Sequence, residues 1–532
     1  MAAELRDGLN MTSKPLPPLP DRLVECTALD IASCVLYVDL RRAGDPLLLT
    51  WLDRCRAAGV TLQVRRSDLD DVLSMRDKGL ARSVRNGGAD DDLRVRQASI
   101  QMVGKAAKYR ASDIHLLLRG NYAEVQVRIK GDLKVLAKIS QTEAEELSRA
   151  LYQGIATVKD SSFNPLEYQN AQISGDAIQD MGMTSVRLVR GPAFPVEAGG
   201  GFVVMRLQYR DAQAAQSEAS RGLPPLPDPR RPEGDLRLAE MGYTSTQVEK
   251  LRYLADTPNG VIAFTGPTGS GKTTSLFEML MHSARQWPEK RQVTIEDPVE
   301  YPMPWAVQMV INNAGNEEET GDAFAERLRT SLRMDPDIIL LGELRGADSA
   351  VAAINAALTG HQVWTTLHVT DPFLSVERLE MMDPKRLNRR VFCDHKIIRG
   401  IIAQRIIPRL CPHCSLPLID HVHEIPDRLL ESIKTYGSVD LVRIKGHGCK
   451  ECGGDGIAGR MAVAEVVVTD SRLMRDFVEH GTDTARRNYR AREDTDCSLM
   501  ENAVLRVLEG SVDPRHVAKY VDVVMDKGKE DL

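Results

Sequence analysis

A glycine-rich segment, Gly266–Thr274, has the residue types and the spacing needed to bind nucleotide phosphates. It contains the pattern G-x-x-x-x-G-K-[ST] in full, after an apolar strand-like run and before a helical one, which is the context that this pattern requires. Backbone N–H groups of such a loop close around phosphates at a helix N-terminus; Lys272 would reach the β- and γ-phosphates, and the Thr273 hydroxyl would bind Mg²⁺. We predict that the whole loop binds nucleotide: Gly266, Pro267, Thr268, Gly269, Ser270, Gly271, Lys272, Thr273 and Thr274.

Three later apolar runs each end in polar residues that could act on those phosphates. The first runs into Glu296 and Glu300, the second ends at Glu343 and the third at His368. The carboxyl ends of parallel strands meet at the ligand crevice of an α/β sheet, where carboxylates can hold Mg²⁺ or polarise water. A single carboxylate here would more simply be a helix cap or a surface charge. The set of three strand ends after a phosphate loop predicts ATP hydrolysis.

Four cysteines form two C-x-x-C pairs, Cys411 with Cys414 and Cys449 with Cys452, separated by 34 residues. The two-residue spacing lets both sulfurs of a pair face one tetrahedral ion, so the four thiolates predict a closed structural Zn²⁺ site. A redox pair is the alternative, although the thioredoxin-like context that it needs is absent.

These sites must be positioned by a chain of 532 residues, which is enough for about three or four domains. No apolar run approaches the roughly 18 residues that a membrane helix needs, and the N-terminus lacks a secretory signal pattern. We therefore expect a cytoplasmic, multidomain protein with reduced thiols. The net charge of −6 argues against general binding of polyanions such as nucleic acid.

The chain is punctuated by two copies of one hexapeptide, LPPLPD, at residues 16–21 and 223–228. We interpret the second copy as part of a stiff interdomain linker, with a docking motif for a partner as the alternative. The expected parts are a disordered Pro-rich N-terminus (1–23), a small α/β unit (24–82), a second N-terminal domain (93–207), the linker (208–235) and a catalytic domain (236–532). Within the small unit we expect a strand at 35–38, a helix at 46–58 and a strand at 60–64.

The runs of residues that carry these features resemble motifs of a known family, the secretion ATPases of type II secretion, type IV pilus and type IV secretion systems. TIEDPVEY at 294–301 resembles its Asp box, LRTSLRMDPDIILLGELR at 328–345 its Walker B region, and TGHQVWTTLH at 359–368 its His box. QRIIPRLC at 404–411 resembles the stretch before its metal motif. The motifs follow the family order from Gly260 to Val466.

The resemblance is weaker upstream. ASDIH at 111–115 and VVMRL at 203–207 resemble the opening and close of the family's second N-terminal domain. Gln126 and Lys130 depart from its V-R-x-R-x-D-G pattern, and Gly346 stands where the family usually has Asp.

The resemblance implies a fold and a set of roles. The fold would be a RecA-like α/β P-loop domain with a zinc-binding insertion (405–460) and C-terminal helices (470–525), after an α+β, PAS-like domain. Lys272 would bind phosphate, Glu300 would activate water, Glu343 would be the Walker B carboxylate and His368 would sense the γ-phosphate, with Glu296 also at the nucleotide. Arg128 and Arg206 would either reach a nucleotide or pair with nearby carboxylates.

The resemblance also implies a function. We expect a homo-hexameric Mg-ATP motor, cytoplasmic and peripheral at the inner membrane, which acts on a membrane platform protein and does not bind nucleic acid directly. The tetracysteine module favours the assembly or export branch, and the weak N-terminal match favours a divergent member such as the thin-pilus ATPase of a conjugative plasmid. The alternatives are a RecA-like nucleic-acid translocating ATPase and a scaffold that binds ATP without turnover.

Overall fold

The computed structural model describes residues 23, 27–30, 35–40, 43–57, 60, 62–67, 89–178, 181–210, 222–311 and 317–528. The chain divides into two compact units, Met1–Ala98 and Ser99–Leu532. Residues 1–22 of the Pro-rich N-terminus that we predicted to be disordered (1–23), including the first hexapeptide, lie outside the described residues, as do 211–221 of the predicted linker. No helix among the described residues is long and apolar enough to cross a bilayer.

Among its described residues, the first unit contains a three-stranded sheet and a helix at Pro46–Ala57, which pack around Leu36, Val38 and Trp51. Its elements are β1 (Thr27–Asp30), β2 (Val35–Asp39), α2 (Pro46–Ala57) and β3 (Gln63–Ser67). The strand and helix predicted at 35–38 and 46–58 are confirmed. The strand predicted at 60–64 begins later, because β3 pairs in parallel with β2 from Gln63 opposite Val35.

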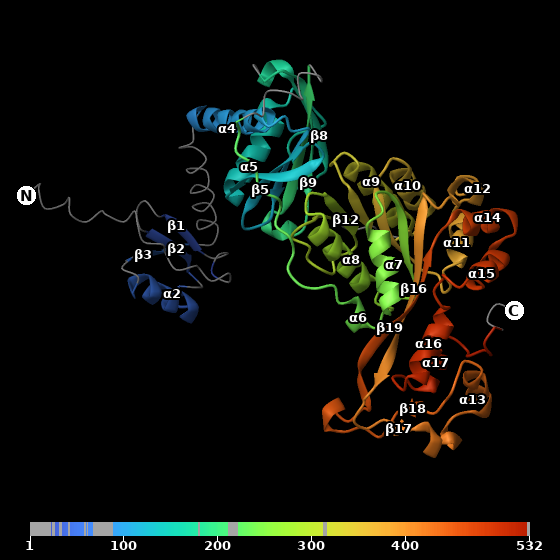
Figure 1. Cartoon of the computed structure of the whole chain (residues 1–532). Coiled ribbons are helices and arrows are strands. Elements are labelled where there is room, and N and C mark those ends of the chain that lie inside the picture. Colours follow the sequence, from blue (N-terminus) through green and yellow to red (C-terminus); the bar gives the residue numbers. More distant parts are fainter. Residues whose placement is uncertain are drawn as a thin grey trace, which may run out of the picture. The chain divides into compact units, whose positions relative to one another are not determined.

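The second unit begins with an antiparallel sheet of seven strands in the order β6-β5-β4-β10-β9-β8-β7 (Figure 1). The strands are β4 (Asp113–Leu118), β5 (Ala123–Ile129), β6 (Asp132–Ile139), β7 (Val158–Lys159), β8 (Gln169–Ser174), β9 (Met183–Pro192) and β10 (Gly201–Tyr209). Helix α4 (Ala89–Lys108) precedes the sheet and α5 (Gln141–Arg149) packs on β4. Helices beside an antiparallel sheet confirm the expected α+β class.

The described part of the predicted linker is held against this antiparallel sheet. Its hexapeptide copy accepts a hydrogen bond from the Val135 backbone N–H at the Pro227 carbonyl (2.8 Å), and Asp228 pairs with Lys134 (2.6 Å). The hydroxyl of Tyr109 donates to the Pro224 carbonyl (3.1 Å). These contacts give a segment without helix or strand a defined path.

The remainder of the second unit is built on a seven-stranded sheet in the order β13-β12-β14-β15-β11-β16-β19, in which every neighbouring pair is parallel except β16 with β19. The strands are β11 (Gly260–Thr265), β12 (Gln292–Glu296), β13 (Val307–Val310), β14 (Ile338–Leu341), β15 (Gln362–Leu367), β16 (Ile398–Leu410) and β19 (Ile457–Val468). This sheet confirms the predicted α/β class. Its parallel strands β11, β12, β14 and β15 end at one edge, where the predicted catalytic residues follow them.

Helices cover both faces of the parallel sheet because successive residues of β11 point to opposite sides. Val261 and Ala263 pack in one core with α9 and α10, whereas Ile262 and Phe264 pack in another with α7 and α8. The helices are α6 (Leu238–Met241), α7 (Ser245–Ala255), α8 (Lys272–Gln286), α9 (Glu317–Ser331), α10 (Ala347–Leu358), α11 (Leu374–Met382) and α12 (Arg389–Phe392).

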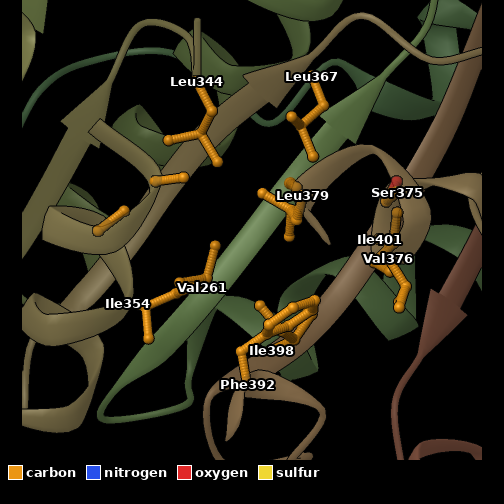
Figure 2. Close-up of a pocket in the computed structure, with 13 residues that line it drawn as sticks. Val261, Leu344, Ile354, Leu367, Ser375, Val376, Leu379, Phe392, Ile398 and Ile401 are labelled. Atoms are coloured by element: carbon orange, nitrogen blue, oxygen red, sulfur yellow. The ribbon is translucent and has the colours of Figure 1, made fainter. Parts of the chain in front are cut away.

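The core on the α10 side contains a small apolar cavity, about 20 Å³ in volume (Figure 2). Side chains such as Val261, Ile354, Leu379 and Phe392 line it, and Ser375 is also among the lining residues. A space of this size holds about one water molecule at most. The cavity on this face is therefore too small for a nucleotide, and the face serves to pack helices against the central strand β11.

Strands β16 and β19 extend beyond the sheet as a long antiparallel pair, which includes both ends of the predicted insertion (405–460). The rest of the insertion, residues 411–456, connects the two strands at the end of this pair (Figure 1). It contains β17 (Leu416–Pro417), α13 (Asp427–Lys434) and β18 (Arg443–Ile444). The C-terminal helices are α14 (Ser471–Glu479), α15 (Thr482–Arg490), α16 (Leu499–Leu508) and α17 (Pro514–Tyr520). Arg490 joins α15 to the sheet through an ion pair with the buried Glu465 of β19 (2.7 Å).

Candidate active site and metal centre

The glycine-rich loop joins β11 to α8 in a conformation that only glycine tolerates at key positions. Gly266 and Gly271 have φ of 146° and 79°. A Cβ atom at Gly266 would lie 2.5 Å from the Gln404 carbonyl oxygen, and one at Gly271 would lie 2.7 Å from the Cδ1 atom of Ile406. Gly271 is also the N-cap of α8 and supplies no side-chain cap. The helix N-terminus therefore keeps backbone donors available for an anion.

Two polar side chains of the loop fit the phosphates of a nucleotide. The Nζ atom of Lys272 donates hydrogen bonds to the carbonyl oxygens of Gly266 and Pro267, both at 2.9 Å, so the ammonium is held over the loop. Burial lowers the pKa of Lys272, and the charges of Glu343 and Glu300 partly oppose this effect. The Ser270 hydroxyl is buried without a hydrogen-bond partner among the described residues. Anionic oxygens would satisfy both groups.

A cleft of about 670 Å³ opens beside this loop at the carboxyl edge of the sheet. Predicted site residues that line it are Thr268, Gly269, Lys272, Thr273, Glu296, Glu300, Glu343 and His368. The other predicted loop residues, Gly266, Pro267, Ser270, Gly271 and Thr274, form the loop behind this lining, and Thr274 bonds to the Tyr301 hydroxyl (3.0 Å). The structure thus gathers carboxylates, a lysine and a histidine from four strand ends around one space.

Glu343 and Glu300 differ in how firmly they are held. The Glu343 carboxylate accepts a hydrogen bond from Arg345 and lies 3.4 Å from the Nε2 atom of His368. Arg345 also reaches Asp297 at 3.4 Å. Glu300 is exposed at the cleft and forms no ion pair within the described part of the chain. The carboxylate of Glu343, which is held by Arg345, suits a positioning role, and the unpaired carboxylate of Glu300 is accessible to water.

Glu296 is placed at the cleft but is buried and already hydrogen-bonded. Its carboxylate accepts hydrogen bonds from Thr294 and Gln308, and burial raises its pKa. Its partners fix the end of β12 beside the cleft. A direct contact between Glu296 and nucleotide stays a prediction.

Two residues at this site escaped the sequence analysis. Arg378, on α11, is exposed and lines the cleft, where its charge could meet a phosphate. Gln404 of β16 donates from Nε2 to the Ser270 carbonyl (2.8 Å) and accepts from the Tyr243 hydroxyl (2.6 Å), so it braces the loop. Both lie more than 100 residues from the loop in sequence, and no local pattern marks them.

The two predicted N-terminal arginines bind carboxylates and do not line the cleft. Arg128 pairs with Asp335 and with Asp337, the latter at 2.7 Å. Arg206 pairs with Asp113 at 2.8 Å and Asp335 at 3.1 Å. This is the alternative that the sequence left open, and a nucleotide contact stays a prediction. Since Asp335 and Asp337 directly precede β14, these pairs link the antiparallel sheet to the strand that leads to Glu343.

Replacing Asp335 with alanine is expected to lower the free energy of unfolding by about 1–3 kcal/mol, because Arg128 and Arg206 each lose one charged hydrogen-bond acceptor and keep another. Arg128 would lose one of its two carboxylates while only 7% exposed. Urea unfolding of the variant would measure the loss. Asp494→Ala, at an exposed site, is the control and should change stability by less than about 0.5 kcal/mol. Equal stabilities of the two variants would contradict the prediction.

His115 on β4 gives stability a dependence on pH. It is 0% exposed, with Nε2 3.4 Å from Asp335; burial and the charge of Arg291 lower its pKa to about 4. In the unfolded chain the pKa of a histidine is about 6.5. Between about pH 4 and this value the unfolded chain therefore binds more protons than the folded chain does. Stability should be fully present above about pH 6.5 and fall by up to about 3 kcal/mol as pH drops towards 4.

This pH effect can be measured by urea unfolding of the wild type and of His115→Gln at several pH values. The variant should lose part of the pH dependence in that window, whereas the exposed-site control His480→Gln should keep it. A variant whose stability changes with pH as steeply as that of the wild type would show that His115 does not titrate as described.

The four cysteines meet at the base of the β16–β19 pair. Their sulfurs all lie within 4.8 Å of one another, and three pairs, Cys411–Cys449, Cys414–Cys452 and Cys449–Cys452, are 3.8 Å apart. Zn–S bonds of about 2.3 Å in a tetrahedron place the sulfurs about 3.8 Å apart. All four thiols are free, so the geometry fits a Zn²⁺ site better than disulfide redox pairs. The cluster is compatible with zinc as predicted.

Backbone donors prepare this cluster for a cation. The backbone N–H groups of Cys449 and Gly456 donate to the Cys452 sulfur, both at 3.2 Å. These hydrogen bonds, the one from Cys449 first, lower the pKa of Cys452 to about 6. A thiolate is therefore favoured at Cys452 near neutral pH, which is the form that binds metal.

Comparison with known proteins points to one family. Residues 230–519 match the family described as "Type II/IV secretion system protein". Over 77% of this chain, 30% of residues are identical to the type IV pilus assembly ATPase PilB of Thermus thermophilus; the chain covers 41% of that protein. It is 28% identical to the type II secretion system ATPase E of Vibrio cholerae, with coverage of 84% of this chain and 78% of that one. It is 30% identical to the protein transport protein HofB homolog of Escherichia coli, covering 76% and 77%.

Proposed function

Because the chain belongs to the type II/IV secretion system protein family, we propose that it is a motor that hydrolyses Mg-ATP to drive type IV pilus assembly or protein export. Membership confirms the predicted secretion ATPase family and the predicted class of enzyme, an ATPase. The chain spans less than half the length of the PilB relative and over three quarters of the ATPase E relative. Its own substrate and machine are therefore part of the proposal.

The observation that carries this proposal is the gathering of Lys272, Glu300, Glu343 and His368 around one cleft beside the phosphate loop. Lys272 and the N-terminus of α8 bind the phosphates. Glu300, which is free and exposed, takes the proton from the attacking water, and Glu343 is held in position at the cleft by Arg345. His368 lies beside Glu343, where it can sense the γ-phosphate.

Residues are also present for the ion that ATP chemistry needs. The Thr273 hydroxyl lines the cleft together with the carboxylates of Glu296 and Glu343. Oxygen ligands of this kind suit Mg²⁺, which when bound neutralises phosphate charge.

The working assembly in this proposal is a ring of six copies at the cytoplasmic face of the inner membrane, docked on a platform protein. Two of the relatives are named for pilus assembly and type II secretion, which supports a machine of this class. The cysteine cluster supports the assembly or export direction. The nucleic-acid motor is not favoured, since the relatives described above are named for pili, secretion and protein transport.

Gene deletion tests the proposal when it is complemented by the wild type, by Lys272→Ala or by the control Lys396→Ala, an exposed lysine outside the cleft. Surface pili, secreted protein and DNA transfer are scored separately. We expect Lys272→Ala to fail wherever the deletion fails, and the control to restore function. Loss of DNA transfer together with thin pili would identify a conjugative machine. Full function with Lys272→Ala would overturn the motor proposal.

A further inference from the structure

A second cleft, about 690 Å³ in volume, lies apart from the glycine-rich loop. It is walled by the antiparallel sheet, by residues 229–233 and by α8 with the segment around Trp305, and it shares no lining residue with the first cleft. Cavities of about 300–1,000 Å³ are the size that small-molecule sites have. Its size and its separation from the loop make it a candidate for a different ligand.

The second cleft is strongly cationic. Six arginines and lysines line it against two glutamates. Glu233 is engaged by Arg230 at 2.6 Å, and Glu124 lies 3.8 Å from Lys138. The remaining cations have no carboxylate within ion-pair distance among the described residues, and they are Arg119, Arg231, Lys290 and Arg291. The cleft therefore carries an excess of positive charge that its own residues do not neutralise.

The side chain of Arg291 shows that burying this positive charge destabilises the folded protein. It is 2% exposed; Nη2 donates to Gln126, but Nε is buried without a partner in the described part of the chain. Burial and the charges of Arg119 and Arg128 lower its pKa to about 9, against the opposing charges of Asp335 and Asp337. A buried guanidinium with an unsatisfied N–H is destabilising unless an anion completes it.

Aromatic rings lie beside these cations. Phe277 and Trp305 line the cleft with their ring centroids 5.8 Å apart, and Tyr122 is 39% exposed at its wall. Arg119 also lines the cleft and donates a hydrogen bond to the Ala306 carbonyl (2.5 Å). The ring faces of Phe277 and Trp305 can stack on a planar ring of a ligand, and guanidinium groups such as that of Arg119 bind phosphate. Together they match a ligand with a planar ring at one end and phosphates at the other.

We propose that this second cleft binds a nucleoside phosphate, with phosphates at Arg119, Arg231 and Arg291 and the base against Phe277 and Trp305. The site has no counterpart of Lys272, Glu300 or Glu343, so the ligand is bound and not hydrolysed. Because the walls come from three segments of the chain, the bound ligand holds the antiparallel sheet, residues 229–233 and α8 together. It thereby acts as an effector of the motor.

The test is a titration of the full-length Lys272→Ala variant with the fluorescent nucleotide mant-ADP. We expect saturable binding of about one probe per chain, which Arg231→Glu in the same background weakens at least about tenfold, because a charge reversal opposes phosphate. Arg231 is exposed and forms no ion pair within the described residues, so the change should leave the thermal unfolding temperature unaltered. The matched control is Arg409→Glu, at an exposed arginine outside both clefts.

Two results would overturn this site: no saturable binding to Lys272→Ala, or binding that Arg231→Glu and Arg409→Glu change equally. The proposed motor is judged separately, by ATP hydrolysis of the Arg231→Glu single variant, whose glycine-rich loop is intact. Hydrolysis by this variant, together with no saturable binding of the probe to Lys272→Ala, would refute the effector site and leave the motor standing.

Discussion

Replacing Glu343 with glutamine is expected to lower the rate of ATP hydrolysis about 10²–10³-fold while ATP still binds. The carboxylate of Glu343 accepts from Arg345 and faces His368 across 3.4 Å. An amide keeps the shape but loses the charge that holds both partners. Binding persists because the glycine-rich loop and Lys272 are untouched.

Glu300→Gln should show the same pattern for a different reason, because it removes the free carboxylate that takes the proton from water. Steady-state hydrolysis measures turnover, and equilibrium binding of a fluorescent ATP analogue measures affinity. Glu249→Gln, at an exposed position on α7, should hydrolyse ATP normally. Normal hydrolysis by Glu343→Gln or Glu300→Gln would remove that residue from the mechanism.

Replacing Cys449 with serine is expected to release zinc and unfold the segment between β16 and β19. Structural zinc sites contribute on the order of 10 kcal/mol, which few contacts within so small a module could replace. Cys449 lies 3.8 Å from the sulfurs of both Cys411 and Cys452, so its loss opens the tetrahedron. Apolar residues of the segment between β16 and β19, such as Ile433 and Ile444, pack in one cluster with the C-terminal helices. Unfolding of this segment should therefore extend to α16.

Metal analysis and limited proteolysis would measure this effect. The wild type purified without chelator should contain about one zinc per chain, and Cys449→Ser should contain none and be cut between residues 411 and 456. Cys497→Ser, which lies outside the cluster, should keep its zinc and its resistance. Wild-type protein without zinc would refute the metal site, and an intact Cys449→Ser would refute its structural role.

The parts of the molecule that the sequence determined alone are those whose chemistry is local. A glycine-rich loop binds phosphate through its own backbone, and a C-x-x-C pair places two sulfurs by its own turn, so both could be recognised from consecutive residues. The parallel sheet was equally predictable, because apolar runs that end in Glu296, Glu343 and His368 are short and separate. The strand at Gln63 was misplaced because pairing with β2, not local composition, sets where it begins.

The tertiary structure decided what depends on contacts between distant residues. Arg128 and Arg206 are arginines on exposed-looking strands in the sequence, and only the packing of two sheets brings them to Asp335 and Asp337, more than 100 residues away. The bracing of the loop by Gln404 and the cationic second cleft arise in the same way. Such contacts leave no periodicity in either segment, since each partner satisfies its own local pattern. The sequence therefore determined which groups perform the chemistry, and the folded chain decided which charges are paired and which stay open to a ligand.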